Sequence, residues 1–248
     1  MDMTQYQIVI PSYKRADTFK NKTFKLLEKH GLLERAFLFV VPEEMSQYSS
    51  ATENKITILK GVPGLVNQRK HIYDQFPDGT MLLFMDDDVK DIIDIEKKSV
   101  ENLDAVICEG FKICKNVGSK IWGIYPVANP FFMDASVSTD LKYIVGAFYG
   151  ILKYGSYVDI PMDDKEDYYR TCAYYQNDGI LARLNYYAPI TKYYKEKGGM
   201  QERRTSETNL AGAILVRDTF PLLATLYTRK TTGNAEIRLK RQKRMGLE

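Results

Sequence analysis

Short apolar runs rich in branched and aromatic side chains alternate with helix-like patterns in the first part of the chain. Four such runs predict buried strands, at residues 7–10, 37–41, 56–59 and 81–85. Between them, apolar residues at helical spacing predict helices over 18–29 and 64–76. This alternation is typical of an α/β fold, with a mostly parallel central sheet flanked by helices. Ligands bind such sheets beyond the carboxyl ends of the strands, so functional residues are expected there.

The pattern changes after about residue 95, where a strand over 121–127 is followed by a segment dense in tyrosine. Twelve of the 18 tyrosines fall between Tyr143 and Tyr194, mostly as adjacent pairs. One interpretation is half-buried strands and helix edges whose hydroxyl groups reach water. The alternative is an aromatic wall on which sugars or bases stack.

The chain has 248 residues and no repeat or low-complexity linker, which suits a single domain. Three cysteines and two histidines exclude a disulfide framework and a structural zinc site. No apolar run approaches the roughly 20 residues that span a bilayer, and the first residues lack the basic and apolar regions of a signal peptide. We therefore expect a reducing, cytoplasmic location.

Charge is unevenly distributed along the chain. Residues 192–248 carry 13 Lys or Arg against 6 Asp or Glu, whereas the preceding 191 residues carry 22 against 26. The overall charge of +3 is therefore an average over an acidic body and a basic terminal part. The densest run, at 238–244, fits either a solvated helix end or a surface that binds a polyanion.

The strongest chemical motif is MLLFMDDDV, an apolar strand that ends in Asp86, Asp87 and Asp88. Three adjacent carboxylates at the end of a buried strand repel one another unless a cation or hydrogen-bond donors lie between them. Oxygen ligands favour Mg²⁺ or Mn²⁺, which completes its shell with substrate phosphates and water. The alternative is acidic capping of a following helix.

Two further motifs place cations at the ends of early strands. In IVIPSYKRAD a first strand runs into Ser12, Tyr13 and Arg15, without the glycines of a P-loop or a dinucleotide fold. Such a turn suits a nucleoside stacked on Tyr13, or it is a plain surface loop. In GVPGLVNQRKHIYDQF, Arg69 shares the helical stripe of Leu65 and Ile72, so its guanidinium faces the sheet and needs an anion. That anion is the acidic cluster, a nucleotide, or a structural Asp partner.

A second acidic group occurs in VDIPMDDKEDYYRT, with carboxylates at residues 163, 164, 166 and 167. A carboxylate set apart from a metal cluster is what transfer to a hydroxyl requires as general base. The alternative is an exposed, acidic helix start.

In their order, these motifs resemble the nucleotide-sugar-dependent glycosyltransferases of the GT-A fold. IVIPSYKR resembles their opening strand and nucleoside turn, GLVNQRKHI their small-residue helix, FMDDDV their Asp-x-Asp motif, and KEDYYR the segment that holds the base of inverting members. The resemblance covers residues 7 to about 185. It implies a nucleotide-sugar-binding half over 1–95 and an acceptor-binding half over 96–248, which ends in the basic segment.

A narrower likeness extends from GIYPVANPFFM to KEKGG. These stretches resemble the DNA-base glycosyltransferases of kinetoplastids, which make base J, and of bacteriophages, which act on 5-hydroxymethylpyrimidines. The basic terminal part agrees with a DNA acceptor, because Lys and Arg near phosphates supply sequence-independent affinity. If the base is flipped out of the duplex, which the sequence does not decide, the tyrosine pairs would stack it. The candidate DNA contacts are Arg203, Arg204, Arg238, Lys240 and Arg241.

The resemblance also implies residue roles. Asp88 and Asp86 would hold Mn²⁺ or Mg²⁺ on the donor diphosphate. Many GT-A enzymes use a late histidine as a further metal ligand, but no histidine follows His71, so water or a residue such as Asn234 or Glu236 would complete the coordination shell. If the enzyme inverts, the general base would be Asp167, with Glu166 and Asp164 as alternatives. The donor site would be formed by Pro11, Ser12, Tyr13, Arg15, Asn67, Arg69, Asp86 and Asp87.

The predicted function is therefore transfer of glucose or arabinose from a UDP-sugar to the hydroxymethyl group of 5-hydroxymethylcytosine in phage-type DNA. One alternative keeps the fold but changes the acceptor to a glycan or lipid head group. Another is a non-catalytic DNA-binding protein in which the aspartates are structural.

Overall fold

The computed structural model describes residues 5–191, 199, 204–230 and 233–242. The four strands predicted in the first part of the chain are present and run parallel to one another. Within the register, Val9 of the first strand lies opposite Phe37 on one side and Phe84 on the other. The strands are β1 (Tyr6–Pro11), β2 (Ala36–Val40), β3 (Thr57–Lys60) and β4 (Met81–Met85).

Helices connect these strands, in two connections where the apolar spacing predicts them and between β2 and β3 where no helix was predicted. The stretch expected at 18–29 is helical, with a π-helical turn in its middle, and the helix expected at 64–76 lies between β3 and β4. The elements are α1 (Ala16–Phe19), η1 (Lys20–Phe24), α2 (Lys25–Lys29), the 3-10 turns η2 (Leu33–Arg35) and η3 (Pro42–Glu44), α3 (Met45–Ala51) and α4 (Leu65–Asp74).

The second part of the chain extends the same sheet, in the order β3-β2-β1-β4-β8-β6-β9-β7. Strand β8 pairs antiparallel with both β4 and β6, and β9 pairs parallel with β6. The sheet is thus mostly parallel, with β8 and β7 reversed. The bounds are β6 (Ile121–Ile124), η4 (Pro130–Phe132), β7 (Val137–Ser138), β8 (Phe148–Leu152) and β9 (Ala182–Leu184). The strand expected over 121–127 therefore ends at Ile124, just before Tyr125 and Pro126.

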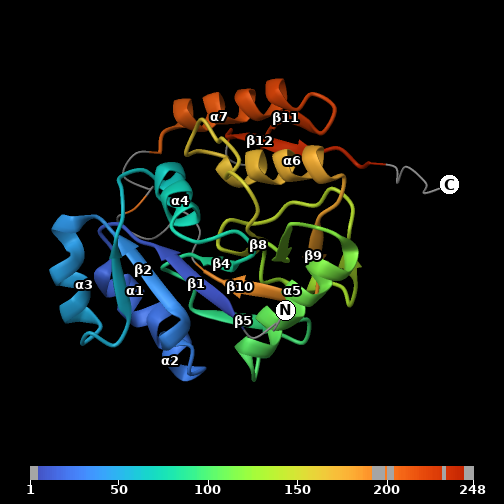
Figure 1. Ribbon diagram of the computed structural model, residues 1–248. Coiled ribbons are helices and arrows are strands. Elements are labelled where there is room, and N and C mark those ends of the chain that lie inside the picture. Colours follow the sequence, from blue (N-terminus) through green and yellow to red (C-terminus); the bar gives the residue numbers. More distant parts are fainter. Residues whose placement is uncertain (1–4, 192–198, 200–203, 231–232, 243–248) are drawn as a thin grey trace.

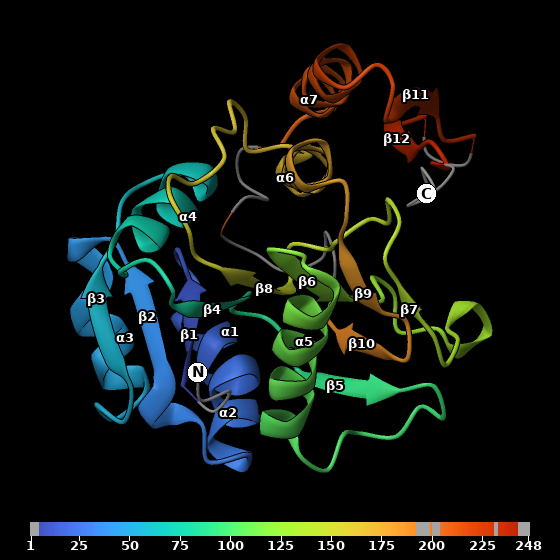
Figure 2. The same cartoon turned by 45° about the vertical axis from the view of Figure 1, so that its right-hand side comes forward.

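Two antiparallel strand pairs and three longer helices complete the described fold (Figures 1 and 2). One pair joins β5 (Asp91–Asp94) to β10 (Tyr187–Ile190), and the other joins β11 (Ala224–Thr228) to β12 (Ala235–Leu239). The helices are α5 (Leu103–Val117), α6 (Glu166–Asp178) and α7 (Ser206–Thr219). Among the described residues, no helix is both long and apolar enough to cross a bilayer.

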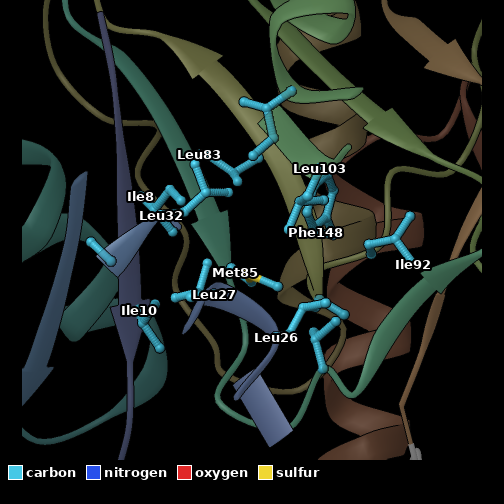
Figure 3. Packing of buried hydrophobic residues seen from close by; sticks show 14 of the residues in the cluster. Ile8, Ile10, Leu26, Leu27, Leu32, Leu83, Met85, Ile92, Leu103 and Phe148 are labelled. Atoms are coloured by element: carbon cyan, nitrogen blue, oxygen red, sulfur yellow. The ribbon is translucent and has the colours of Figure 1, made fainter. Parts of the chain in front are cut away.

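The two faces of the sheet carry separate cores because successive strand residues point to opposite sides. Ile8, Ile10, Leu83 and Met85 pack with side chains of α2 and α5 on one face, as Figure 3 shows. Val9, Phe39, Leu82 and Phe84 pack with α4 and α6 on the other. A third apolar cluster joins α6 to α7 and the β11–β12 pair. Helix α6 is therefore covered by sheet on one side and by C-terminal elements on the other.

Trp122 of β6 is fully buried in the first core and depends on two glycines. A Cβ atom at Gly110 of α5 would lie 2.4 Å from the indole ring, and one at Gly150 of β8 would lie 1.9 Å from its Nε1. The indole is thus held in a slot between a helix and a strand.

We expect Gly110→Ala to lower the free energy of unfolding by ~1–3 kcal/mol, because the added methyl group overpacks this slot. The loss should appear although alanine stabilises a helix by about 1 kcal/mol relative to glycine. Urea denaturation measures it, with the exposed Lys112→Ala in the same helix as control. A variant as stable as the control would contradict the packing described here.

Candidate active site

A cavity of about 240 Å³ opens at the carboxyl edge of the sheet. Strands β1 to β4 end at this edge, and β8 begins there because it runs antiparallel to β4. The wall is formed by residues just after β1, β2, β3 and β4, the start of α4, the segment before β8 and the start of α6. The cavity thus lies beyond the carboxyl ends of the parallel strands, where ligands bind such sheets.

The turn after β1 brings all four of its predicted donor residues, Pro11, Ser12, Tyr13 and Arg15, to the cavity. The Ser12 hydroxyl donates to Asp87 Oδ2 over 2.5 Å. Arg15 Nη1 lies 3.2 Å from Asp87 Oδ1 and 3.7 Å from Asp88 Oδ2. The turn and the acidic cluster are therefore one bonded unit.

Tyr48 of α3 holds this turn and was not predicted from the sequence. Its hydroxyl lies 2.7 Å from Ser12 Oγ and accepts a hydrogen bond from the Arg15 backbone N–H at 2.9 Å. No element was predicted at Tyr48 from the sequence. It reaches the turn in the fold, where α3 follows β2 and β2 pairs parallel with β1.

The three aspartates after β4 all line the cavity but have different partners. Asp86 bonds to Arg69 at 3.0 Å and leaves 34% of its side chain exposed. Asp88 accepts a 2.7 Å hydrogen bond from Thr191 Oγ1. Burial raises the pKa of Asp86 to about 7 and that of Asp87 to about 6; repulsion among the three carboxylates adds to both, while Arg69 and Arg15 oppose it.

The residues present fit a hard divalent cation held by few protein ligands. In the described part of the chain no three His, Cys, Asp or Glu side chains converge into a complete ligand set. Ser12 and Arg15 bind both oxygens of Asp87, whereas Arg69 bonds to one oxygen of Asp86 and Thr191 to one oxygen of Asp88. Asp86 and Asp88 are therefore better able than Asp87 to bind a cation. Mn²⁺ and Mg²⁺ accept such sets, since phosphates and water fill their remaining positions. Neither Asn234 nor Glu236, the suggested additional ligands, is among the residues that line the cavity.

Arg69 is buried, as its helical stripe predicts, and it joins two carboxylates. Its Nη2 donates to Asp86 Oδ1 at 3.0 Å and to the Gly146 carbonyl at 3.1 Å, and its Nη1 lies 2.6 Å from Glu166 Oε1. Glu166 Oε2 is bonded by Arg170 Nη1 at 2.5 Å. The Arg170 guanidinium lies over the Tyr149 ring, 3.8 Å from its centroid. Two cations thus hold Glu166, so it is poorly suited to accept a proton as a base.

Asp167, the first of the three candidate bases, lines the cavity and is bonded by a tyrosine hydroxyl and a backbone N–H. It is half-buried and lines the cavity. Its Oδ1 accepts from the Tyr168 backbone N–H at 2.9 Å, and its Oδ2 accepts from the Tyr143 hydroxyl. The Tyr143 ring stacks on Tyr168 with centroids 4.2 Å apart. These contacts fix the carboxylate in the cavity wall.

Several predicted residues have other places in the structure. Asn67 is exposed, because its position on the helix points away from the sheet, and its amide faces the Pro63 carbonyl. The next residue, Gln68, is buried and lines the cavity instead. Asp164 is buried in an ion pair with Arg204 Nε at 2.5 Å and is absent from the cavity wall, which corrects its role as an alternative base.

Some of the predicted DNA contacts have partners within the fold, and others are exposed. Arg204 lines the cavity and pairs with Asp164, so it is not an outer phosphate contact. Lys240 donates to the Pro221 carbonyl at 2.5 Å. Arg238 and Arg241 are exposed on or just after β12. Arg203 lies outside the described residues.

Most of the described tyrosines between 143 and 187 are structural. Tyr149 and Tyr174 are buried, and Tyr186 and Tyr187 bond to Glu109. Of the tyrosines in this described stretch, Tyr143 alone lines the cavity. An extended aromatic wall is not formed there, which favours the interpretation of half-buried structural residues.

No protein-family model and no curated protein matches this chain. Solved structures do. TarS of S. aureus superposes with a TM-score of 0.54 and 15% identity over 86% of this chain, which spans only 39% of the length of TarS. Glucosyl-3-phosphoglycerate synthase from Mycobacterium tuberculosis, in complex with UDP, superposes with a TM-score of 0.50 and 8% identity over 95% of this chain and 87% of that one. The chain has the GT-A fold. At these identities the likeness shows the fold alone.

We expect Arg69→Met to lower the free energy of unfolding by ~3 kcal/mol, the lower end for breaking a buried ion pair, because Glu166 keeps Arg170 as a partner. Chemical denaturation measures the change. The control is Arg35→Met, which breaks the partly exposed pair with Asp104 and should cost at most ~1 kcal/mol. Equal losses in the two variants would show that the buried network has no special role in stability.

Proposed function

We propose that this protein is a metal-dependent glycosyltransferase that moves a sugar from a UDP-sugar to an acceptor hydroxyl. The observation that carries the proposal is that one cavity is lined by the Tyr13–Arg15 turn, by the aspartates after β4 and by Asp167. A nucleoside site, a cation site and a base are the three parts that such a transfer needs. The neighbour solved with UDP agrees with this choice of donor.

In this proposal residues 1–95 bind the donor and residues 96–248 supply the base and bind the acceptor. Tyr13 would stack the uracil ring, and Arg15 would contact the diphosphate. Asp86 and Asp88 would hold Mn²⁺ or Mg²⁺, which when bound offsets the negative charge on the departing diphosphate.

Asp167 would accept the proton of the acceptor hydroxyl as its oxygen bonds to the anomeric carbon. The bond from that carbon to the diphosphate oxygen breaks in the same displacement, and UDP leaves with the electron pair. Attack from the face opposite the leaving group inverts the anomeric centre. Glu166 takes no part in proton transfer because two guanidinium groups already neutralise it.

The acceptor we propose is the hydroxymethyl group of 5-hydroxymethylcytosine in DNA, with glucose or arabinose as the sugar. The support is the resemblance of the motifs and the basic C-terminal part. In residues 204–242, seven Lys or Arg stand against three Asp or Glu. Arg238 and Arg241 are exposed there, and Arg238 lies over the Tyr227 ring at 5.0 Å. These two are the cations we assign to DNA phosphates.

A matched pair of variants tests the donor site and the base separately. Wild type should be stabilised in a thermal melt by UDP with Mn²⁺, and should transfer sugar from UDP-glucose or UDP-arabinose. Asp88→Asn should lose both the Mn²⁺-dependent shift and transfer. Asp167→Asn should keep the shift while kcat falls ~10²–10⁴-fold, as expected for loss of a general base.

The control for both is Asp159→Asn, an exposed carboxylate outside the cavity wall. An absent UDP shift in the wild type would favour the non-catalytic alternative. An unchanged kcat in Asp167→Asn would remove the base assignment, and an unchanged shift in Asp88→Asn would remove the metal assignment.

The acceptor is tested with 5-hydroxymethylcytosine DNA that is digested to nucleosides for mass spectrometry, where a glycosylated nucleoside is expected. Binding to this duplex should weaken steeply between about 50 and 200 mM salt. Arg238→Ala/Arg241→Ala should weaken it and reduce the salt dependence by about one phosphate contact per arginine.

The matched control is Lys25→Ala/Lys29→Ala, two exposed cations of α2, which lies at the other end of the molecule from β12 in both views (Figures 1 and 2). Donor hydrolysis with no product on DNA, and equal binding by the two double variants, would favour a glycan or lipid head-group acceptor.

A further inference from the structure

Five consecutive side chains, at residues 163–167, contact α4, the segment before β8 and the C-terminal elements; we call this stretch the base segment. On one side, Asp163 Oδ1 accepts a 2.8 Å hydrogen bond from the Val66 backbone N–H at the start of α4, and Glu166 pairs with Arg69. Asp167 bonds to Tyr143. These contacts tie the base segment to the proposed donor half and to the segment before β8.

On the other side, the contacts come from the C-terminal module, which we define as α7, β11, β12 and the described residues around them, 204–230 and 233–242. Arg204 pairs with Asp164 at 2.5 Å. Lys165 Nζ lies 2.9 Å from Glu236 Oε2 of β12. A Cβ at Gly212 of α7 would lie 2.5 Å from the Asp164 carbonyl oxygen, so α7 packs directly on the backbone of the base segment. Figure 2 shows α7 and the β11–β12 pair beside α6.

Lys165 has an unusual backbone. Its φ is 63°, in the left-handed region that side-chain-bearing residues rarely adopt, and it immediately precedes α6. Such a conformation persists only where surrounding contacts hold it. The ion-pair contact on its side chain is Glu236, in a pair whose side chains are 5% and 15% exposed, and its ammonium also lies 5.9 Å from the centroid of the Tyr168 ring. Release of the pair would allow the turn to relax, and Asp167 lies two residues further on.

We propose that the C-terminal module positions the base, with Glu236 as a positioning residue that acts through Lys165. This inference rests on the proposed function, since it concerns the orientation of Asp167. Removal of the Glu236 charge takes away the ion-pair partner of the buried Lys165 ammonium, which then keeps the weaker contact with the Tyr168 ring. The relaxed turn would then shift the Asp167 carboxylate, while the Asp86–Asp88 cluster on β4 keeps its own partners.

The test is Glu236→Gln in the full chain. We expect kcat to fall ~10–100-fold, the effect of about 1 Å of misplacement, with KM for the UDP-sugar and the Mn²⁺-dependent UDP shift unchanged. Hydrogen–deuterium exchange should rise in peptides covering 163–170 and stay constant in those covering 81–90. Glu207→Gln, an exposed carboxylate of α7, is the matched control and should behave as wild type. If Glu236→Gln does not fold, Glu236→Asp keeps the charge at a shorter reach and should show a smaller change of the same kind.

Wild-type kcat together with wild-type exchange in the variant would overturn the proposal. So would parallel losses of kcat and UDP binding with raised exchange throughout, because that result describes general destabilisation. If the wild type neither binds UDP nor turns it over, the proposed function fails. The exchange comparison would then still decide whether Glu236 holds the base segment.

Discussion

The buried guanidinium of Arg69 is the interaction on which the site depends. It joins the Asp86 carboxylate, at the end of the central parallel strand β4, to Glu166 at the start of α6. The buried guanidinium needs these anions: without it Asp86 would lose its ion-pair partner, whereas Glu166 would keep Arg170. The strand end and the helix start are therefore fixed relative to each other. The cavity lies where they meet, and Gly146 leaves the room that the guanidinium needs.

The parts of this site that come from the first half of the chain follow from local sequence patterns. Apolar runs gave β1 to β4, and helical spacing placed Arg69 on the face toward the sheet. The acidic cluster followed from three carboxylates at a strand end. The partner Glu166 did not follow, because 97 residues separate it from Arg69 and their contact requires the antiparallel insertion of β8 beside β4. The spacing of apolar residues along the chain does not predict which strands become neighbours in a sheet.

Residue type alone also misassigned roles within correctly located segments. Asn67 and Gln68 are adjacent amides, and a one-residue step around the helix decides which one faces the cavity. Among the acidic residues near the start of α6, Asp164 and Glu166 form ion pairs with arginines, whereas Asp167 accepts a hydrogen bond from a tyrosine hydroxyl. Charge counting likewise placed Arg204 and Lys240 on a DNA surface, although both have partners within the fold. These distinctions depend on tertiary contacts between segments far apart in sequence.

The reversed direction of β8 has a consequence for how the chain can vary. Because this strand starts at the cavity and runs away from it, its far end lies at the opposite edge of the sheet, where Tyr154, Gly155 and Ser156 are exposed. The segment before β8 must keep Tyr143 and Gly146 in place. The turn after it is bonded to Tyr73 and Asp78 through the backbone of Tyr154 and Gly155, so a label is better attached at the exposed Ser156, at a distance from the cavity.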